Sequence, residues 1–409
     1  MEVRFIGGAR EIGRSAILVD DRLLLDYGMA GGNPPRYPPA VDPEAVVVSH
    51  GHLDHVGLVP KLLAGGDRPA IHWTPPTRDL AYVLGRDTID LQGDRYDRPF
   101  TANEVQALGE VSVEHQYEES FRAAGYEITL YTAGHIPGSA HVLVDDGETR
   151  LLYTADFHTE PQRLLAPSTA RPDADAVIVE STYADHERPP RTEIESAFVD
   201  YVRAARHQGG SVVVPAFAIG RTQEILLICD AYDIECYVDG MGIRVLDYFL
   251  GRADFVRDPQ ALRAASGHAR RVSGRDGQRR RIVDSGTTVV TTAGMLNGGP
   301  AMTYVPAIAG NPTNAVAMTG YQVEDTPGRA LLEDKAAELD GRMVQVSAGV
   351  EQFDFSAHAD RQGLLSFLSE YSDARVLVNH GDECERFAGR LRDEGFDAAA
   401  PRNGEIVEL

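Results

Sequence analysis

Short runs of apolar, largely β-branched residues recur along this chain, and each run ends in a polar residue with metal-binding or acid–base chemistry. Such runs, without regular polar alternation, are typical of strands that are buried on both faces of a sheet. Residues at strand ends often carry the chemistry of sheet-based enzymes. We therefore expect these ends to converge on one edge of a layered sheet. The runs are Leu23–Asp26, Val46–His50, Thr129–His135, Leu151–Asp156, Val177–Glu180 and Val376–His380.

The pattern changes between Glu180 and Gln345, where strands, glycine-containing loops and helices alternate, and this order predicts a parallel α/β domain. A helix is expected over residues 192–208, and strands over residues 211–215, 237–238, 287–292 and 315–319. Polar strand ends return from Phe355 onward, so this α/β domain is an insertion in a metal-binding sheet domain. A length of 409 residues is consistent with two domains. The expected boundaries are 1–182 and 347–409 for the enclosing domain and 183–346 for the insertion.

The residues His50–His55 hold three histidines and one aspartate directly after an apolar strand. Imidazole and carboxylate groups together are suitable ligands for zinc-like divalent ions. His50 and His52 alternate along an extended segment, and Asp54 and His55 are offset far enough to serve a second ion. A polar loop with chance histidines is the alternative, but so many ligand-type residues in so short a segment favour a metal site.

The charge is strongly unbalanced, with 62 Asp and Glu against 39 Lys and Arg and a formal net charge of −23. Lys61 and Lys335 are the only lysines. A surface of this kind is typical of halophilic proteins, where salt screens the self-repulsion, although a GC-rich genome also favours arginine. Acidity argues against a nucleic acid partner unless the site itself is positive. The arginine-rich stretch from Arg263 to Arg281 is either a polyanion contact or a solvated loop paired with neighbouring acids.

No membrane segment or disulfide framework is expected. The chain has no run of 18 apolar residues and no basic, apolar signal segment at Met1. Three scattered cysteines are too few for a disulfide scaffold or a cysteine zinc site, and we interpret them as buried small hydrophobic residues. These features predict a cytoplasmic protein without a membrane partner.

Seven motifs together resemble the metallo-β-lactamase superfamily, and within it the β-CASP nucleases. The residues that carry the resemblance are Asp26 in Leu-Asp-Tyr-Gly, His50-Gly51-His52-Leu53-Asp54-His55, His135, Asp156, Glu180 (motif A), His358 (motif B) and His380 (motif C). Gly51 replaces a commoner alanine and Asp382 a commoner glutamate, and neither change removes a ligand. The resemblance implies an αββα metallo-β-lactamase sandwich with an inserted parallel α/β β-CASP domain.

The resemblance also implies two zinc ions per chain. One ion would be held by His50, His52 and His135, the other by Asp54, His55 and His380, with Asp156 as the bridging ligand. Such a pair of ions lowers the pKa of a water and clamps a phosphodiester. Asp26 would orient the ligands without binding an ion itself. The alternative is a turn aspartate before Tyr27-Gly28.

His358 is the candidate general acid, and Glu180 would hold and orient its ring. Asp54 is grouped with them as a candidate catalytic residue. The other histidines are interpreted as structural, with His158 and His186 the least certain because both follow ligand-type residues in loops that face the site. This structural set is His72, His115, His141, His158, His186, His207 and His268.

Two glycine-containing loops precede helices, at residues 218–221 and 294–299. Helix N-termini bind anions, but neither loop has the P-loop pattern, so no nucleotide cofactor is expected. Ordinary strand-to-helix turns are the alternative. Arg221 and Ser356 are the candidate RNA or phosphate contacts.

The expected function is a zinc-dependent ribonuclease that acts on single-stranded RNA in 3′-end processing or decay, alone, as a homo-dimer or in a processing complex. The residue His380 in motif C favours RNA over DNA, by analogy with the family. A hydrolase of a small ester, thioester or lactam would not need the inserted domain. A non-catalytic RNA-binding scaffold would have lost ligands. Endonuclease and 5′-exonuclease activity stay open, and neither N-terminal KH-type domains nor an RNase J-type C-terminal domain is expected.

Overall fold

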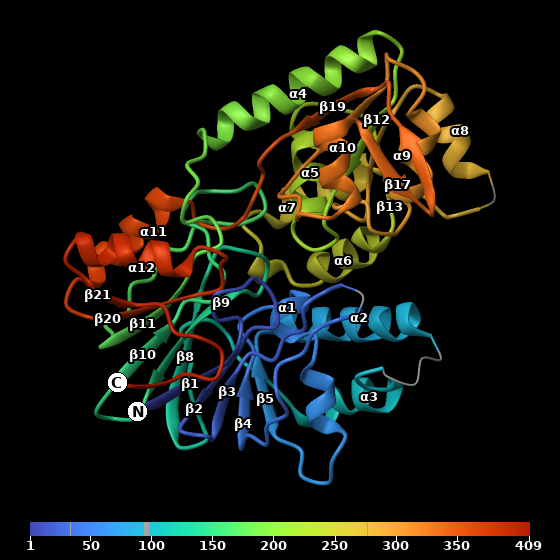
Figure 1. Ribbon diagram of the computed structural model, residues 1–409. Helices are drawn as coiled ribbons and strands as arrows, with labels where there is room; N and C mark the ends of the chain where they lie inside the picture. Colours follow the sequence, from blue (N-terminus) through green and yellow to red (C-terminus); the bar gives the residue numbers. More distant parts are fainter. Residues whose placement is uncertain (33, 94–97, 276) are drawn as a thin grey trace. The chain divides into compact units, whose positions relative to one another are not determined.

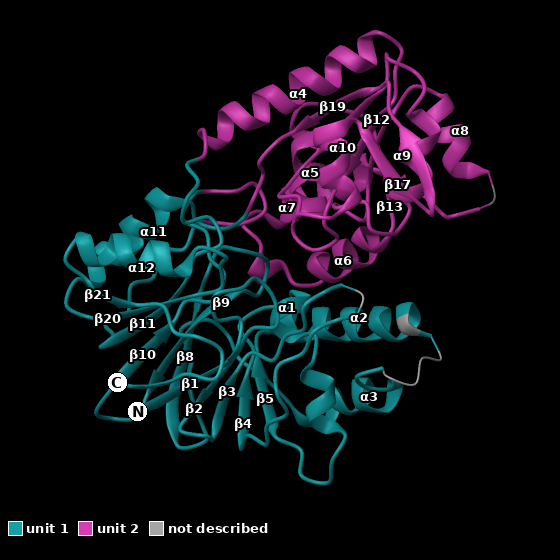
Figure 2. Cartoon of the chain, viewed as in Figure 1, with its two compact units in different colours: residues 1–160, 167–187, 357–409 teal, residues 161–166, 188–356 magenta. Residues whose placement is uncertain are grey.

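A computed structural model describes residues 1–32, 34–93, 98–275 and 277–409. The chain divides into two compact units (Figures 1 and 2). Unit 1 comprises residues 1–160, 167–187 and 357–409, and unit 2 comprises residues 161–166 and 188–356. Residues 347–356, expected in the enclosing domain, thus lie in unit 2, because β19 (Gly349–Gln352) pairs with β16 (Ala315–Met318).

Unit 1 contains two sheets, each of seven described strands. The first sheet has the order β22 (Ile406–Glu408), β1 (Glu2–Gly7), β2 (Ala16–Val19), β3 (Leu23–Leu25), β4 (Ala45–Val47), β5 (Ala70–Trp73), β6 (Ser112–Glu114). The second has the order β21 (Asp397–Ala399), β20 (Arg375–Asn379), β11 (Ala176–Glu180), β10 (Arg150–Tyr153), β9 (Ala140–Asp145), β8 (Tyr126–Thr132), β7 (Ser120–Ala123).

The two sheets pack face to face, and helices cover their outer faces (Figure 1). Phe5 and Ile17 of the first sheet share one buried cluster with Ile128 and Val142 of the second. The first sheet is covered by α1 (Leu53–Val56), α2 (Pro75–Gln92) and α3 (Ala102–Val111), with η1 (Val59–Leu63). The second is covered by α11 (Arg361–Leu368), η3 (Ser369–Tyr371) and α12 (Cys384–Asp393). The expected αββα layers are confirmed.

The strand directions explain why polar residues meet at one edge. β3 and β4 are parallel, and so are β10, β11 and β20. β8 also runs in the direction of β10, because both are antiparallel to β9. Residues that follow these strands therefore lie at the same edge of their sheet, as the apolar runs predicted.

Unit 2 is an α/β domain whose sheet has only parallel strand pairs among the described residues. The strand order is β14 (Arg270–Arg271), β13 (Cys236–Asp239), β15 (Thr288–Thr291), β12 (Val212–Pro215), β16, β19. A hairpin of β17 (Ala336–Leu339) and β18 (Arg342–Gln345) is separate. The helices are α4 (Arg191–His207), α5 (Arg221–Ala231), α6 (Met241–Leu250), η2 (Ala253–Phe255), α7 (Pro259–His268), α8 (Gln278–Asp284), α9 (Ala301–Ile308) and α10 (Pro327–Asp334).

The arginine-rich stretch is partly neutralised within unit 2. Arg271 pairs with Asp247, Arg279 pairs with Asp239, and Arg270 lies 3.6 Å from Glu235. The paired, solvated alternative therefore describes these three arginines, while residue 276 lies outside the described residues.

The three cysteines have the burial that the sequence predicts. The cysteines Cys229, Cys236 and Cys384 are free and buried, as small hydrophobic residues would be. None of the described helices combines the length and apolar character needed to cross a membrane.

Candidate functional site

Asp156 lies between two groups of histidines and offers one carboxylate oxygen to each. Its Oδ2 is 3.5 Å from His50 Nε2 and 3.7 Å from His135 Nε2. Its Oδ1 is 3.3 Å from His55 Nε2 and 3.6 Å from His380 Nε2. Ala155, just before it, has a φ of 46° and so bends the backbone sharply at the end of β10. The arrangement is that of a carboxylate shared by two sites.

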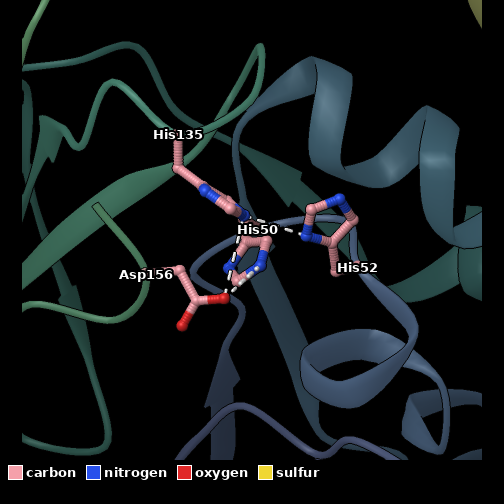
Figure 3. Close-up of side chains that lie close together, drawn as sticks. All are labelled: His50, His52, His135 and Asp156. Atoms are coloured by element: carbon pink, nitrogen blue, oxygen red, sulfur yellow. Dashed lines mark hydrogen bonds and ion pairs between the residues drawn. The ribbon is translucent and has the colours of Figure 1, made fainter. Parts of the chain in front are cut away.

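Each group is compact enough to hold one cation. Ligand atoms of His50, His52, His135 and Asp156 lie within 4.8 Å of one another, and His52 Nδ1 is 2.9 Å from His135 Nε2 (Figure 3). A second group with the same spacing consists of Asp54, His55 and His380. The structure thus brings together all seven residues predicted as metal ligands.

Two buried polar atoms in the centre fit a bound cation. Within the part of the chain that the structure describes, neither His50 Nε2 nor Asp156 Oδ1 has a hydrogen-bond partner. Leaving such an atom unsatisfied costs about 1–3 kcal/mol, so their clustering calls for a ligand. Imidazole nitrogens and carboxylate oxygens are donors for a zinc-like ion. The residues therefore fit the metal that the donor set implies.

Burial and charge favour cation binding by the first group and Asp156. Burial lowers the pKa of His50 and His135 well below the ordinary value and lowers the pKa of His52 to about 4. These rings are therefore neutral at pH 7 and present lone pairs. Burial opposes the charge of Asp156 as well, but His380 and His55 bring the pKa of its carboxyl well below the ordinary value.

The Asp26 carboxylate accepts four hydrogen bonds from groups around the histidine cluster. Its Oδ1 accepts the Ser49 N–H at 2.7 Å. Its Oδ2 accepts from the Ser49 hydroxyl and His55 Nδ1, each at 2.7 Å, and from the Tyr153 hydroxyl at 2.8 Å. A turn residue alone would not need these contacts. With Asp156, Asp26 also raises the pKa of His55 well above its ordinary value, although burial lowers it.

The ring nitrogens that face away from the cluster are held as well. His380 Nδ1 is 2.9 Å from the Ser15 hydroxyl, and His135 Nδ1 donates to the Ala357 carbonyl at 2.8 Å. Such outer partners fix the ring orientation of histidine ligands. Sequence reasoning missed Ser15, Ser49 and Tyr153. The last two stand beside quoted motifs, which was a usable signal, whereas Ser15 had none.

A carboxylate–imidazole pair lies beside the first group. His358 Nδ1 is 2.9 Å from Glu180 Oε2 and 3.1 Å from Oε1. The Glu180 side chain is 1% exposed, whereas that of His358 is 18% exposed and can reach a substrate. The ring centroids of His358 and His135 are 4.6 Å apart. The acid–base pair and the ligand cluster thus form one continuous site in unit 1.

Gly51, the departure from the commoner alanine, has a steric reason. A Cβ at this position would lie 2.5 Å from Leu80 Cβ and 2.6 Å from Leu80 Cδ1. Real Cβ atoms essentially never approach this closely, so α2 would have to shift. Glycine allows the backbone between His50 and His52 to pack directly against Leu80.

The remaining histidines separate into three environments. His72 and His115 are buried and share a hydrogen bond of 2.9 Å, and His141 is buried against Thr154 and Ser168. His186 and His207 are exposed, and His268 is half-buried. His158 is 2% exposed and so is buried like His141, but its Nδ1 lies 2.9 Å from the carbonyl oxygen of His358, the candidate acid.

The two candidate phosphate contacts lie in unit 2. Arg221 begins α5 after Gly220, whose φ is 79°, and is 8% exposed. Ser356 is 4% exposed, and its carbonyl accepts from Arg188 Nη1 at 3.0 Å. Their contact with RNA stays a prediction.

Three family profiles match separate parts of the chain. Residues 11–196 match the profile described as the Metallo-beta-lactamase superfamily, and residues 222–331 match the Beta-Casp domain. Residues 343–401 match the "Zn-dependent metallo-hydrolase RNA specificity domain".

Curated relatives are similar over the whole chain. "RNase aCSPSF2" of Saccharolobus solfataricus is 33% identical, over 100% of this chain and 85% of the relative. "Probable RNase MJ4" of Methanocaldococcus jannaschii is 31% identical over 100% of both chains. "Transcription termination factor FttA" of Methanothermobacter thermautotrophicus is 31% identical, over 99% of this chain and 71% of the relative. A crystal structure of a protein of unknown function from Enterococcus faecalis has the same fold, with a TM-score of 0.64, 13% identity and coverage of 100% and 99%.

Proposed function

Because the chain belongs to the metallo-β-lactamase superfamily, and within it to the β-CASP ribonucleases, we propose that it hydrolyses phosphodiester bonds of single-stranded RNA during 3′-end processing or decay. Two relatives that match along the whole of this chain carry ribonuclease names, and the third profile concerns RNA specificity. The observation that carries the proposal is the Asp156 carboxylate, shared by two ligand groups beside the His358–Glu180 pair.

The metal assignment is zinc, with two ions per chain. His50, His52 and His135 would hold one ion and Asp54, His55 and His380 the other, with Asp156 shared. Bound ions of this kind supply Lewis-acid catalysis and lower the pKa of a water nucleophile. The neutral rings of the first group and the anionic Asp156 match what such ions require of their ligands.

Within the chain itself, His358 donates a proton to the leaving group. The Glu180 carboxylate accepts from Nδ1, so Nε2 is the nitrogen that exchanges a proton with substrate. An alkoxide oxygen of RNA is a poor leaving group and needs that proton as the phosphorus–oxygen bond breaks. A thiolate leaves without one, so this acid pair favours RNA over a thioester. The seven ligand-type residues are all present, which argues against a silent scaffold.

The net charge of −23 opposes RNA binding at long range. Salt weakens this repulsion, because the Debye length falls from about 10 Å at 0.1 M to about 3 Å at 1 M. A salt-rich cytoplasm would therefore reconcile the acidic surface with an RNA substrate. The halophilic origin, the cytoplasmic location and a homo-dimer or processing complex stay predictions of the same proposal.

The proposal is tested first by metal content and by end-labelled RNA. Purified protein should contain close to two zinc equivalents by mass spectrometry of metals; a folded protein that binds none would contradict the metal assignment. RNAs with a 5′-monophosphate or a 5′-triphosphate, labelled at one end, should be cleaved. Discrete internal cuts would identify an endonuclease, and mononucleotides a 5′-exonuclease.

Substitution of His358 tests the acid. The variant His358→Ala should keep its zinc and lose roughly 10²–10⁴-fold in RNA cleavage, the contribution of a general acid. His207→Ala, an exposed histidine at the end of α4, is the matched control and should cleave like the parent. Unchanged cleavage by His358→Ala would remove this residue as the acid.

A further inference from the structure

The segment Asp156–Phe157–His158, separated from the end of β10 by two residues, touches both halves of the site. Asp156 is the carboxylate between the two ligand groups. The Phe157 N–H donates to Glu180 Oε1 at 2.9 Å, and the Phe157 carbonyl accepts the Ala359 N–H at 2.6 Å. These three consecutive residues therefore contact both the ligand cluster and the acid–base pair.

His158 completes this segment with a side-chain contact to the acid residue. Its Nδ1 is 2.9 Å from the His358 carbonyl oxygen, and because a carbonyl only accepts, Nδ1 carries the proton. The backbone of His158 is itself fixed, since its N–H donates to the Ala133 carbonyl at 2.9 Å and its carbonyl accepts the Ser168 N–H at 2.8 Å. The buried ring is thus a rigid donor and not a mobile surface group.

His358 needs such support, because it lies in a loop and not in a helix or strand. Three successive contacts hold this loop. His135 Nδ1 donates to the Ala357 carbonyl, His158 Nδ1 donates to the His358 carbonyl, and Ala359 donates to Phe157. Together they fix the peptide planes on both sides of the His358 Cα, whereas Glu180 fixes only the rotation of the ring.

We propose that His158 is a positioning residue for His358: its imidazole holds the His358 peptide so that the acid points at the leaving oxygen. The inference rests on the proposed function, in which His358 donates that proton. It revises the sequence-based interpretation of His158 as a structural histidine. A displacement near 1 Å can cost about 100-fold in rate, so one buried hydrogen bond at the acid's own carbonyl matters to catalysis.

The competing explanation is that His158 merely satisfies buried polar groups. If so, replacing His158 should lower the stability of the protein and affect its activity on all substrates alike. Positioning of an acid predicts selectivity, because a substrate whose leaving group needs no proton bypasses His358. Bis(p-nitrophenyl) phosphate is such a substrate, since p-nitrophenolate is a stable anion.

The experiment compares His158→Phe with His158→Asn on RNA and on bis(p-nitrophenyl) phosphate. Phenylalanine keeps the ring but removes the donor, whereas the asparagine amide places an N–H close to the Nδ1 position. For His158→Phe we expect kcat on RNA to fall at least about 10-fold, with KM and zinc content unchanged and kcat on the aryl ester within about twofold of the parent. His158→Asn should recover most of the RNA activity.

Other results would overturn the inference. Equal loss on both esters, loss of zinc, or unchanged RNA cleavage by His158→Phe would each show that the residue does not act through the acid. If His158→Phe does not fold, His158→Gln replaces it, because its amide lies one carbon further out and should recover less RNA activity than asparagine. Equal recovery by both amides would contradict the proposed geometry.

Failure of the proposed function has its own signature. In that case the parent protein would not cleave RNA, and the inference falls with it. If the parent cleaves RNA but His358→Ala loses equally on RNA and on the aryl ester, the ribonuclease function stands, while the acid role of His358 and the inference both fail. If His358→Ala is selectively defective on RNA while His158→Phe is not, only the inference about His158 fails.

Discussion

All 13 histidines carry the same imidazole ring, so the surroundings of each ring decide its role. His50 and His135 are buried around a carboxylate, and burial lowers the pKa of both rings, so they are neutral. His358 faces Glu180, which fixes its protonated nitrogen. His141 is equally buried, but it faces a backbone carbonyl and the Ser168 hydroxyl and has the role of a core residue. At this scale, chemistry follows from the partner of the ring.

His141 should make stability depend on pH. Burial, with the positive charge of Arg171, lowers the pKa of His141 to about 4. The unfolded chain takes up this proton near pH 6.5 and the folded chain only near pH 4, so stability is lost as the pH falls through this window. The loss from this group amounts to about 3 kcal/mol. In urea unfolding at pH 7, 5.5 and 4.5, the free energy of unfolding should decline less for His141→Gln than for the parent. If the two free energies fall in parallel with pH, the assignment is contradicted.

At the scale of elements, the six residues 161–166 belong to unit 2 although their chain neighbours belong to unit 1. Glu224 on α5 holds this segment, because its two carboxylate oxygens accept the Arg163 N–H at 3.1 Å and the Leu164 N–H at 2.8 Å. Arg191 on α4 pairs with the same carboxylate at 2.7 Å. Burial opposes the charge, but Arg191 and the two N–H donors keep the pKa of Glu224 below its ordinary value.

Removal of this carboxylate should release the segment. Glu224→Ala leaves Arg191, whose side chain is 10% exposed, without its carboxylate partner, and breaking such a largely buried pair costs about 3–5 kcal/mol. Hydrogen exchange at the amides of Arg163 and Leu164 should become faster. Glu193→Ala, an exposed glutamate on α4, is the control and should leave both amides protected. Unchanged exchange in Glu224→Ala would show that other contacts hold the segment.

For the whole molecule, the net charge of −23 dominates the long-range electrostatic interactions. Like charges on a folded surface repel one another and favour expansion, and salt screens that repulsion. The scattered ion pairs of the surface neutralise only neighbouring groups and contribute little each.

The folded protein should therefore be more stable in salt. The midpoint of thermal unfolding should rise as KCl increases from about 0.05 M to 2 M, because the screening length falls below the spacing of surface charges. Sucrose at equal osmolality is the control, since it strengthens burial without screening charge. A midpoint that is independent of KCl would count against the halophilic interpretation.

Much of the fold and of the candidate site was predictable, because local patterns encode both. The apolar run Val177–Glu180 lies in a buried strand, and the parallel order of unit 2 follows from alternating strands and helices. The ligand-type residues were recognisable because imidazole and carboxylate groups are rare in such numbers at strand ends. The boundaries were less predictable, since residues 347–356 and 161–166 join unit 2 through pairing and hydrogen bonds with distant chain.

The sequence by itself therefore determined which residues can bind a metal and move a proton, because that chemistry belongs to the side chains. Only the tertiary structure decided which groups hold them in place. Ser15 contacts His380 across 365 positions, Tyr153 reaches Asp26 across 127, and His158 reaches His358 across 200. A serine, a tyrosine or a single histidine carries no distinctive local signal, and its role arises only when folding brings it against its partner.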